Sequence, residues 1–174
     1  MAVTLRPAAE ADLVAVNDIY NHYVRTCTCT YQEAPETMDS RREWFRQHGG
    51  PHPVIVAEAE GLAVGWGSLS QFHPRSAFRH TVEDSVYVHH GHQGRGLGSL
   101  LLPELVRQAR ALGHRAIIGA IDSQQPGSIA LHTKFGFQEV GRLRGVGLKF
   151  GRWLDVVYMQ LALDPGSPLA DARE

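Results

Sequence analysis

Cysteine is scarce in this sequence, and neither long apolar runs nor an excess of charge of one sign is present. The two cysteines in 174 residues are Cys27 and Cys29, separated by one threonine. A C-x-C pair is poorly placed to form an intrachain disulfide, and two thiols alone do not complete a structural zinc site. We therefore expect both side chains to behave as small, buried or partly buried groups. Nothing in this cysteine usage indicates an oxidising compartment.

The charges are almost balanced, with 17 Lys and Arg against 18 Asp and Glu and a formal net charge of -1. Such a balance gives no broad field that would attract nucleic acid or a membrane surface. No apolar run approaches the roughly 20 residues that a bilayer-spanning helix needs. The first residues, MAVTLRPAAEADL, lack the basic start and apolar stretch of a secretory signal. We therefore expect a cytoplasmic protein that binds neither nucleic acid nor membrane.

The length suits one domain, which is expected over residues 1–163 and is followed by a flexible polar tail over 164–174. Apolar spacing and turn residues give the order β-α-α-β-β-β-α-β-α-β-β. This order predicts an α/β (α+β) fold, in which helices cover a mixed sheet, without repeats or a second domain. The expected strands are 3–6, 53–59, 62–71, 81–88, 115–121, 137–143 and 153–163. The expected helices are 8–24, a segment capped by Asp39, a segment from the glycines near 96 to about 111, and 128–135.

Two local features accompany this order. Glu60-Gly61 is expected to turn a hairpin between two strands. Pro103 lies inside the expected helix after the glycine segment, where proline removes a hydrogen bond and costs about 3 kcal/mol. We expect it in the first two turns, with the helix bent there.

The segment HQGRGLGS, residues 92–99, places three alternating glycines between a strand and a helix. Glycine lets the backbone approach a ligand closely, and free N–H groups at a helix start favour anions, so the segment predicts a phosphate site. A strand-to-helix turn that merely needs glycine is the alternative. A Walker loop is excluded because no lysine follows Gly98. A dinucleotide fingerprint fits poorly because Ser99 replaces its third glycine, although Asp122 mimics its ribose-binding acid.

The pattern Gln93-Gly94-Arg95-Gly96-Leu97-Gly98 resembles the Q/R-x-x-G-x-G/A signature of the GCN5-related N-acetyltransferases, or GNAT family. The segments NHYVRTCTCTY, TVEDSVYV, SIALHTKFGF and GLKFGRWLDVVYMQL resemble the phosphinothricin acetyltransferase branch, which includes enzymes that acetylate methionine sulfone and methionine sulfoximine. The resemblance implies a GNAT fold with a mostly antiparallel sheet, acetyl-coenzyme A (acetyl-CoA) as cosubstrate and a homodimer. It also implies that Gly94 to Ser99 hold the pyrophosphate and that the backbone of Val86, Tyr87 and Val88 lines the acetyl and pantetheine arm. Gln125 departs from the pattern, since relatives usually carry Asn there to contact that arm.

Acetyl transfer to an amine needs a neutral nitrogen, and a carboxylate can remove the proton. Glu83 is the expected general base, because E-x-S-V-Y-V matches the spacing of the branch; a solvated strand glutamate is the alternative. Asp84 and Ser85 adjoin it as expected substrate contacts, although Asp84 faces the other way in a regular strand. His132 stands four residues before Gly136, at a position where many relatives carry a tyrosine that acts as the general acid. It is expected to protonate the leaving sulfur or relay the amine proton, unless it is simply a packed histidine.

Substrate capture is assigned to residues that suit an amino acid. Arginine is the fitted partner of a carboxylate, so Arg75 and Arg79 are the candidates in FHPRSAFRHT. Tyr31 is expected to give an aromatic wall, and Lys149 to close the pocket from the final hairpin. No metal is expected: the cluster of His89, His90 and His92 leads directly into the glycine segment and has no evident carboxylate partners.

The sequence thus predicts an acetyl-CoA-dependent N-acetyltransferase that acts on a small amino-acid-like amine. An enzyme that acetylates protein or peptide amines is one alternative. A non-catalytic acetyl-CoA sensor that retains the cofactor loop is another.

Overall fold

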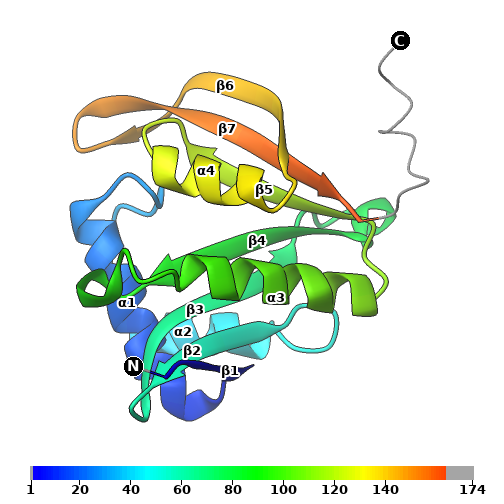
Figure 1. Cartoon of the computed structure of the whole chain (residues 1–174). Helices are drawn as coiled ribbons and strands as arrows, with labels where there is room; N and C mark the ends of the chain where they lie inside the picture. The colour runs from blue at the N-terminus through cyan, green and yellow to red at the C-terminus, as the bar shows by residue number, and fades with distance from the viewer. Residues whose placement is uncertain (1, 164–174) are drawn as a thin grey trace.

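The computed structural model describes residues 2–163 (Figure 1). The predicted tail, 164–174, lies outside the described residues. The element order and the α/β class are as predicted. The strands are β1 (Thr4–Pro7), β2 (Val54–Ala59), β3 (Leu62–Gln71), β4 (Thr81–Val88), β5 (Ala116–Asp122), β6 (Gln138–Lys149) and β7 (Arg152–Ala162). The helices are α1 (Leu13–Thr26), α2 (Met38–Arg46), α3 (Gly98–Ala111) and α4 (Pro126–Lys134), with short 3-10 turns at 10–12, 76–78 and 90–92.

The seven strands form one sheet in the order β1-β2-β3-β4-β5-β7-β6. Every pairing is antiparallel except that of β4 with β5, so the sheet is mixed and mostly antiparallel. The parallel pairing is short: it joins residues 81–83 to 116–118 and then stops, although both strands continue. Figure 1 shows β4 and β5 meeting at one end and separating toward the other. The sheet therefore opens in its middle.

Helices cover both faces of the sheet. On one face, α1 packs with Val16, Ile19 and Tyr23 against Val56 and Trp66 of the sheet. On the other face lies α3, seen in front of the sheet in Figure 1. Its buried residues share a core cluster with β2, β3, β4 and β5, namely Leu101, Leu102, Leu105 and Ala109 with Ile55, Leu69, Val82 and Ile117. None of the helices within residues 2–163 has the length and apolarity to cross a membrane.

Several local predictions can be compared with the structure. The Glu60-Gly61 turn is confirmed, with φ of 53° and 78° at the two residues. Pro103 lies inside α3 in its second turn, as predicted. The cap of α2 was assigned wrongly, because Thr37 accepts the hydrogen bond from the Ser40 N–H at 3.1 Å and Asp39 lies inside the first turn.

The last hairpin also differs from its prediction. β6 runs to Lys149, six residues beyond the predicted end at Leu143, and pairs with β7 through two register shifts. Its glycines and exposed charges hide the alternation that marks a half-buried strand. The strand forms because β7 supplies its hydrogen bonds.

Candidate active site

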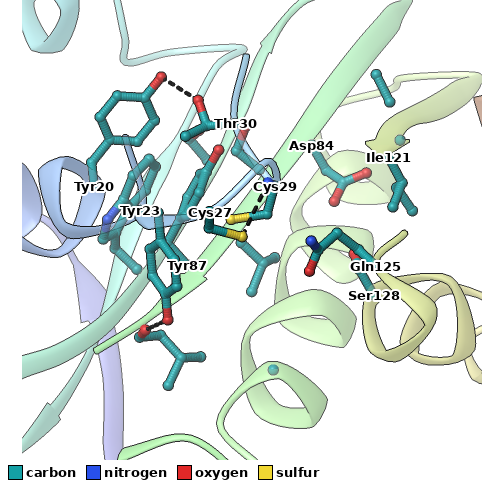
Figure 2. A pocket seen from close by; sticks show the side chains of 18 of the residues that line it. Tyr20, Tyr23, Cys27, Cys29, Thr30, Asp84, Tyr87, Ile121, Gln125 and Ser128 are labelled. Atoms are coloured by element: carbon teal, nitrogen blue, oxygen red, sulfur yellow. Dashed lines mark hydrogen bonds between the residues drawn. The ribbon is translucent and has the colours of Figure 1, made fainter. Parts of the chain in front are cut away.

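A cavity of about 940 Å³ occupies the opening between β4 and β5. The N-terminal end of α3 and the start of α4 border one part of it, and α1, α2 and the loop after α1 border the rest. Figure 2 shows Tyr20, Tyr23, Tyr87 and the two cysteines on one side, with Asp84, Ile121, Gln125 and Ser128 facing them. The divergence of two parallel strands thus creates the room for ligands.

The glycine segment forms one end of this cavity. Gly94 and Gly96 have φ of 72° and 79°, a conformation that glycine adopts without strain. Within residues 2–163, none of the backbone N–H groups from 94 to 99 donates a hydrogen bond. Because α3 begins at Gly98, these amides and the helix start together suit an anion. The arrangement fits a pyrophosphate, and Gly94, Gly96, Leu97 and Gly98 line the cavity.

Other residues of the motif take different positions. The Gln93 side chain donates to the Tyr23 hydroxyl at 2.7 Å, and that hydroxyl donates to the Val88 carbonyl, so the loop is tied to α1 and β4. Arg95 is exposed and does not line the cavity. Ser99 lies outside the lining too, with Lys134 Nζ at 3.4 Å from its Oγ.

The middle of the cavity runs along β4. Val86, Tyr87 and Val88 line it, and the Tyr87 ring stacks on Trp66 with centroids 4.9 Å apart. Gln125 lines the opposite wall just before the first turn of α4. No hydrogen bond holds its side-chain amide within the described part of the chain, so it is free to contact a ligand.

Glu83 is half-buried in the lining, directly opposite Ser70 in the β3–β4 pairing. Its carboxylate accepts no hydrogen bond from any residue between 2 and 163. Burial raises the pKa of Glu83, and the negative charge of Asp84 raises it further. A carboxylate with a raised pKa and free oxygens is suited to accept a proton.

Asp84 points to the other face of the sheet, as a regular strand requires, and meets His132 of α4. His132 Nε2 lies 3.0 Å from Asp84 Oδ2, and Nδ1 lies 2.8 Å from the Ser128 carbonyl. Because the carbonyl can only accept, Nδ1 carries a proton, and a second proton on Nε2 completes the contact with the carboxylate. Burial lowers the pKa of His132, but the hydrogen bond and charge of Asp84 and the Ser128 carbonyl outweigh it and raise the pKa. The two contacts and the raised pKa suit an imidazolium that donates from both nitrogens.

Glycine at position 119 makes room for this pair. A Cβ there would lie 3.1 Å from the His132 ring and 3.3 Å from Asp84 Oδ1. The pair crosses β5 at the one residue of that strand without a side chain, and so links α4 to β4.

A polar chamber, here named the α2 chamber, lies on the α1 and α2 side of the sheet. Its floor is made by cross-strand pairs of β3 and β4, Ser68 with Ser85 and Ser70 with Glu83. Its roof comes from α2. The α2 chamber is defined by Arg41, Trp44, Trp66, Ser68, Ser70, Glu83 and Ser85, all of which line the cavity. Sequence reasoning found Glu83 and Ser85 but missed the others, because no local motif marks them.

The remaining predicted substrate residues lie apart from one another. Tyr31 lines the cavity, and its hydroxyl is buried without a partner among the described residues. Lys149 is only 2% exposed, and its ammonium donates to the Cys27 and Thr30 carbonyls at 2.8 and 2.7 Å. It holds the loop after α1 and does not line the cavity. Arg75 and Arg79 are exposed beside the 76–78 turn, and neither lines the cavity.

The two cysteines belong to the cavity wall, which the sequence did not indicate. The Cys29 N–H donates to Cys27 Sγ at 3.1 Å (Figure 2). The thiol of Cys29 and this N–H stabilise the Cys27 thiolate and lower the pKa of Cys27 to about 6. The same contact, with burial, raises the pKa of Cys29. Between them, Thr28 donates to the buried carboxylate of Asp122, which fixes the loop on β5.

The model of the acetyltransferase (GNAT) family matches residues 16–137. The chain belongs to the GNAT acetyltransferase family. A GNAT N-acetyltransferase uses acetyl-CoA as its acetyl donor. The dinucleotide alternative is thereby removed, and Asp122 serves the loop after α1.

Individual relatives cover nearly the whole chain. The chain is 42% identical over 164 residues to the L-methionine sulfoximine/L-methionine sulfone acetyltransferase of Salmonella typhimurium, across 93% of this chain and 95% of that protein. It is 38% identical over 167 residues to the phosphinothricin N-acetyltransferase of Alcaligenes faecalis, across 95% of this chain and 85% of that protein. A phosphinothricin acetyltransferase of the GNAT superfamily from Sinorhizobium meliloti, solved with acetyl-CoA, superposes with a TM-score of 0.92 at 40% identity. That superposition covers 96% of this chain and 91% of the other.

Proposed function

We propose that this GNAT enzyme transfers the acetyl group of acetyl-CoA to the amine of a small amino acid of the methionine sulfone, methionine sulfoximine or phosphinothricin type. The 42% identity to the Salmonella typhimurium enzyme over 93% of the chain carries this proposal. The α2 chamber supports it, because polar side chains and a buried arginine suit a small charged acceptor better than an apolar one.

In the proposed reaction the amine enters the α2 chamber and meets Glu83. The carboxylate removes the ammonium proton, directly or through water, which leaves a nitrogen lone pair for attack on the thioester. Acetyl-CoA supplies that thioester, and the nitrogen forms its bond to the acetyl carbon as the carbon–sulfur bond breaks. The open edge of β4 from 84 to 88 provides backbone groups along the acetyl arm. Cys27 and Cys29 take no covalent part in this one-step transfer.

His132 is our proposed acid for the departing thiolate. Its Nε2 proton points at Asp84, so delivery to sulfur requires either a relay through Asp84 or release of the ring from the carboxylate.

A direct assay tests the substrate class. Glufosinate, methionine sulfoximine and methionine sulfone are each incubated with acetyl-CoA, and release of the free thiol is followed. Turnover of at least one is expected. If none is acetylated while a peptide or another amine is, the substrate class is wrong and the acetyltransferase assignment stands.

We also propose that the enzyme is a homodimer joined through the final hairpin. β6 is an edge strand, and exposed apolar side chains lie on it, on the turn that follows and at the start of β7. Trp153, the largest, is 68% exposed. A monomer rarely exposes so many large apolar side chains on one edge hairpin. Light scattering should give the mass of a dimer, and Trp153→Glu with Leu148→Glu should give that of a monomer. The exposed apolar side chains of this hairpin are Val140, Leu143, Val146, Leu148, Phe150 and Trp153.

A further inference from the structure

Arg41 is a buried cation whose guanidinium forms no ion pair within residues 2–163. The residue is 4% exposed and lies in α2 over the sheet. Its guanidinium carbon lies 4.7 Å from the ring centres of both Tyr20 and Trp44 and 5.8 Å from that of Trp66. These rings hold the planar group by cation–π contact and limit its rotation. Arg41 forms no ion pair with any residue between 2 and 163.

The donors of Arg41 are mostly unused. Its Nε donates to Asn17 Oδ1 at 3.2 Å, and no described residue accepts a hydrogen bond from Nη1 or Nη2. Asn17 is itself fixed, because its amide donates to the Glu36 carbonyl at 3.0 Å. The Glu36 carboxylate accepts from the Ser40 hydroxyl and forms no ion pair with Arg41. Nε is thus fixed by Asn17, whereas Nη1 and Nη2 remain free to donate.

An unpaired guanidinium at this depth is costly. Transfer of a charge out of water is compensated only by an opposite charge and full hydrogen bonding. Aromatic stacking satisfies the faces of the guanidinium but none of its N–H groups, which point outward in its plane. Arg41 lines the cavity, and it is the one lysine or arginine to do so within residues 2–163. A ligand in the cavity could therefore accept hydrogen bonds from the free donors Nη1 and Nη2.

We propose that Arg41 binds the carboxylate of the amino-acid substrate and so makes the enzyme select amino acids over simple amines. This inference rests on the proposed function, since it names the group that the α2 chamber recognises. The planar fork of an arginine matches the two oxygens of a carboxylate, and the flanking rings hold it ready for that contact.

Arg75 and Arg79 were predicted from the sequence for this role, but neither lines the cavity. Both are exposed, where water already solvates the guanidinium and little is gained by a further partner. They therefore serve as matched controls for Arg41.

The experiment compares two acceptors that differ by one group. Methionine sulfone and 3-(methylsulfonyl)propylamine share the amine and the sulfone, but only the first has a carboxylate. Values of kcat/KM are measured for both with wild type, Arg41→Gln, Arg75→Gln and Arg79→Gln. Arg41→Gln should lower kcat/KM for methionine sulfone about 10- to 100-fold, the effect of one charge-assisted contact, mainly through KM. The value for the amine should stay unchanged, and the two controls should behave as wild type.

If Arg41 has only a structural role, Arg41→Gln should lower kcat/KM equally for both acceptors. That outcome overturns the proposal. The proposal is also overturned if Arg79→Gln or Arg75→Gln lowers kcat/KM for methionine sulfone alone while Arg41→Gln keeps the wild-type value. If Arg41→Gln does not fold, as judged by circular dichroism, Arg41→Lys replaces it. The lysine keeps the charge but lacks the fork, so a smaller loss confined to the carboxylated acceptor is expected.

A binding measurement separates this proposal from the proposed function. Methionine sulfone is titrated calorimetrically into wild type and Arg41→Gln, each saturated with coenzyme A. Weaker binding to the variant supports the role of Arg41 even if no acceptor is acetylated. Equal binding to both proteins refutes it even if turnover is high.

Discussion

Glu83 and Asp84 are neighbours in β4, yet their carboxylates point to opposite faces of the sheet and have opposite surroundings. Asp84 is buried against the imidazolium of His132, whereas the oxygens of Glu83 face the α2 chamber without a hydrogen bond from residues 2–163. One carboxylate is therefore held against His132, and the other has free oxygens that suit it to accept a proton. The charge of the first raises the pKa of the second.

Replacement of the base should separate catalysis from cofactor binding. Glu83→Gln keeps the shape but cannot take a proton, so kcat should fall about 10²- to 10⁴-fold while affinity for acetyl-CoA stays unchanged. In the wild type, kcat/KM should rise with pH as Glu83 deprotonates, with a midpoint above the ordinary glutamate pKa of 4.5. Stopped assays over a pH series measure both. Full activity of the variant would disprove the role, and an inactive wild type would favour the sensor alternative.

The Asp84–His132 pair should make stability depend on pH in a defined direction. The folded pKa of His132 lies above its ordinary value of 6.5, so the pair stabilises fully below about pH 6.5. This contribution is lost as the pH rises through the raised folded pKa. Asp84→Asn should therefore cost about 1–3 kcal/mol near pH 6 and less near pH 9, in urea unfolding. Asp39→Asn, at an exposed ion pair with Arg42, is the control and should show no such trend. A constant difference across this range would contradict the assignment.

A side chain at Gly96 should damage the anion site through the backbone. Gly96→Val forces a β-branched residue into φ of 79°, so the loop must shift and its amides lose their common direction. Coenzyme A affinity, measured by calorimetry, should fall at least tenfold. Gly113→Val is the matched control, because φ is 77° there and the residue lies outside the cavity. Gly96→Val and Gly113→Val should be destabilised to a similar extent, and only Gly96→Val should bind coenzyme A more weakly.

Cys27 should be the reactive thiol. A pKa of about 6 makes it largely thiolate at pH 7, and the residue lines the cavity. Iodoacetamide should alkylate Cys27 faster than Cys29, whose pKa is raised. Coenzyme A in the cavity should slow the reaction. Mass spectrometry of tryptic peptides identifies the site, and Cys27→Ser is the control. Faster alkylation of Cys29 would reverse the assignment.

The sequence was most informative where the decisive contacts are local. β4 was predicted with its observed bounds because TVEDSVYV is rich in β-branched residues. The spacing of the glycine segment, Glu83 and His132 along the chain singled them out as site candidates, and residues of all three line the cavity. The two faces of β4 also followed from strand geometry alone.

What the sequence did not reveal depends on contacts between distant segments. Arg41 looks like any residue of a charged helix, and only packing against Tyr20 and Trp66 shows that it is buried. Cys27 and Cys29 are partly buried, as expected, but the sequence did not show that the opening between β4 and β5 makes their loop a cavity wall. Lys149 was expected in the pocket, yet two carbonyls of that loop hold its ammonium. Such placements follow from topology, which residue patterns along one segment do not encode.

The early end of the β4–β5 ladder has a mechanical consequence. Beyond Glu83 and Ile118 the molecule consists of two half-sheets, β1–β4 and β5–β7, joined across the gap by few links such as Asp84 to His132. Strand edges without partners are normally found at a border, and here they lie in the interior of the sheet. We expect an extended cosubstrate with amides along its length to fill that seam as a surrogate strand. Binding of acetyl-CoA should then also stiffen the scaffold.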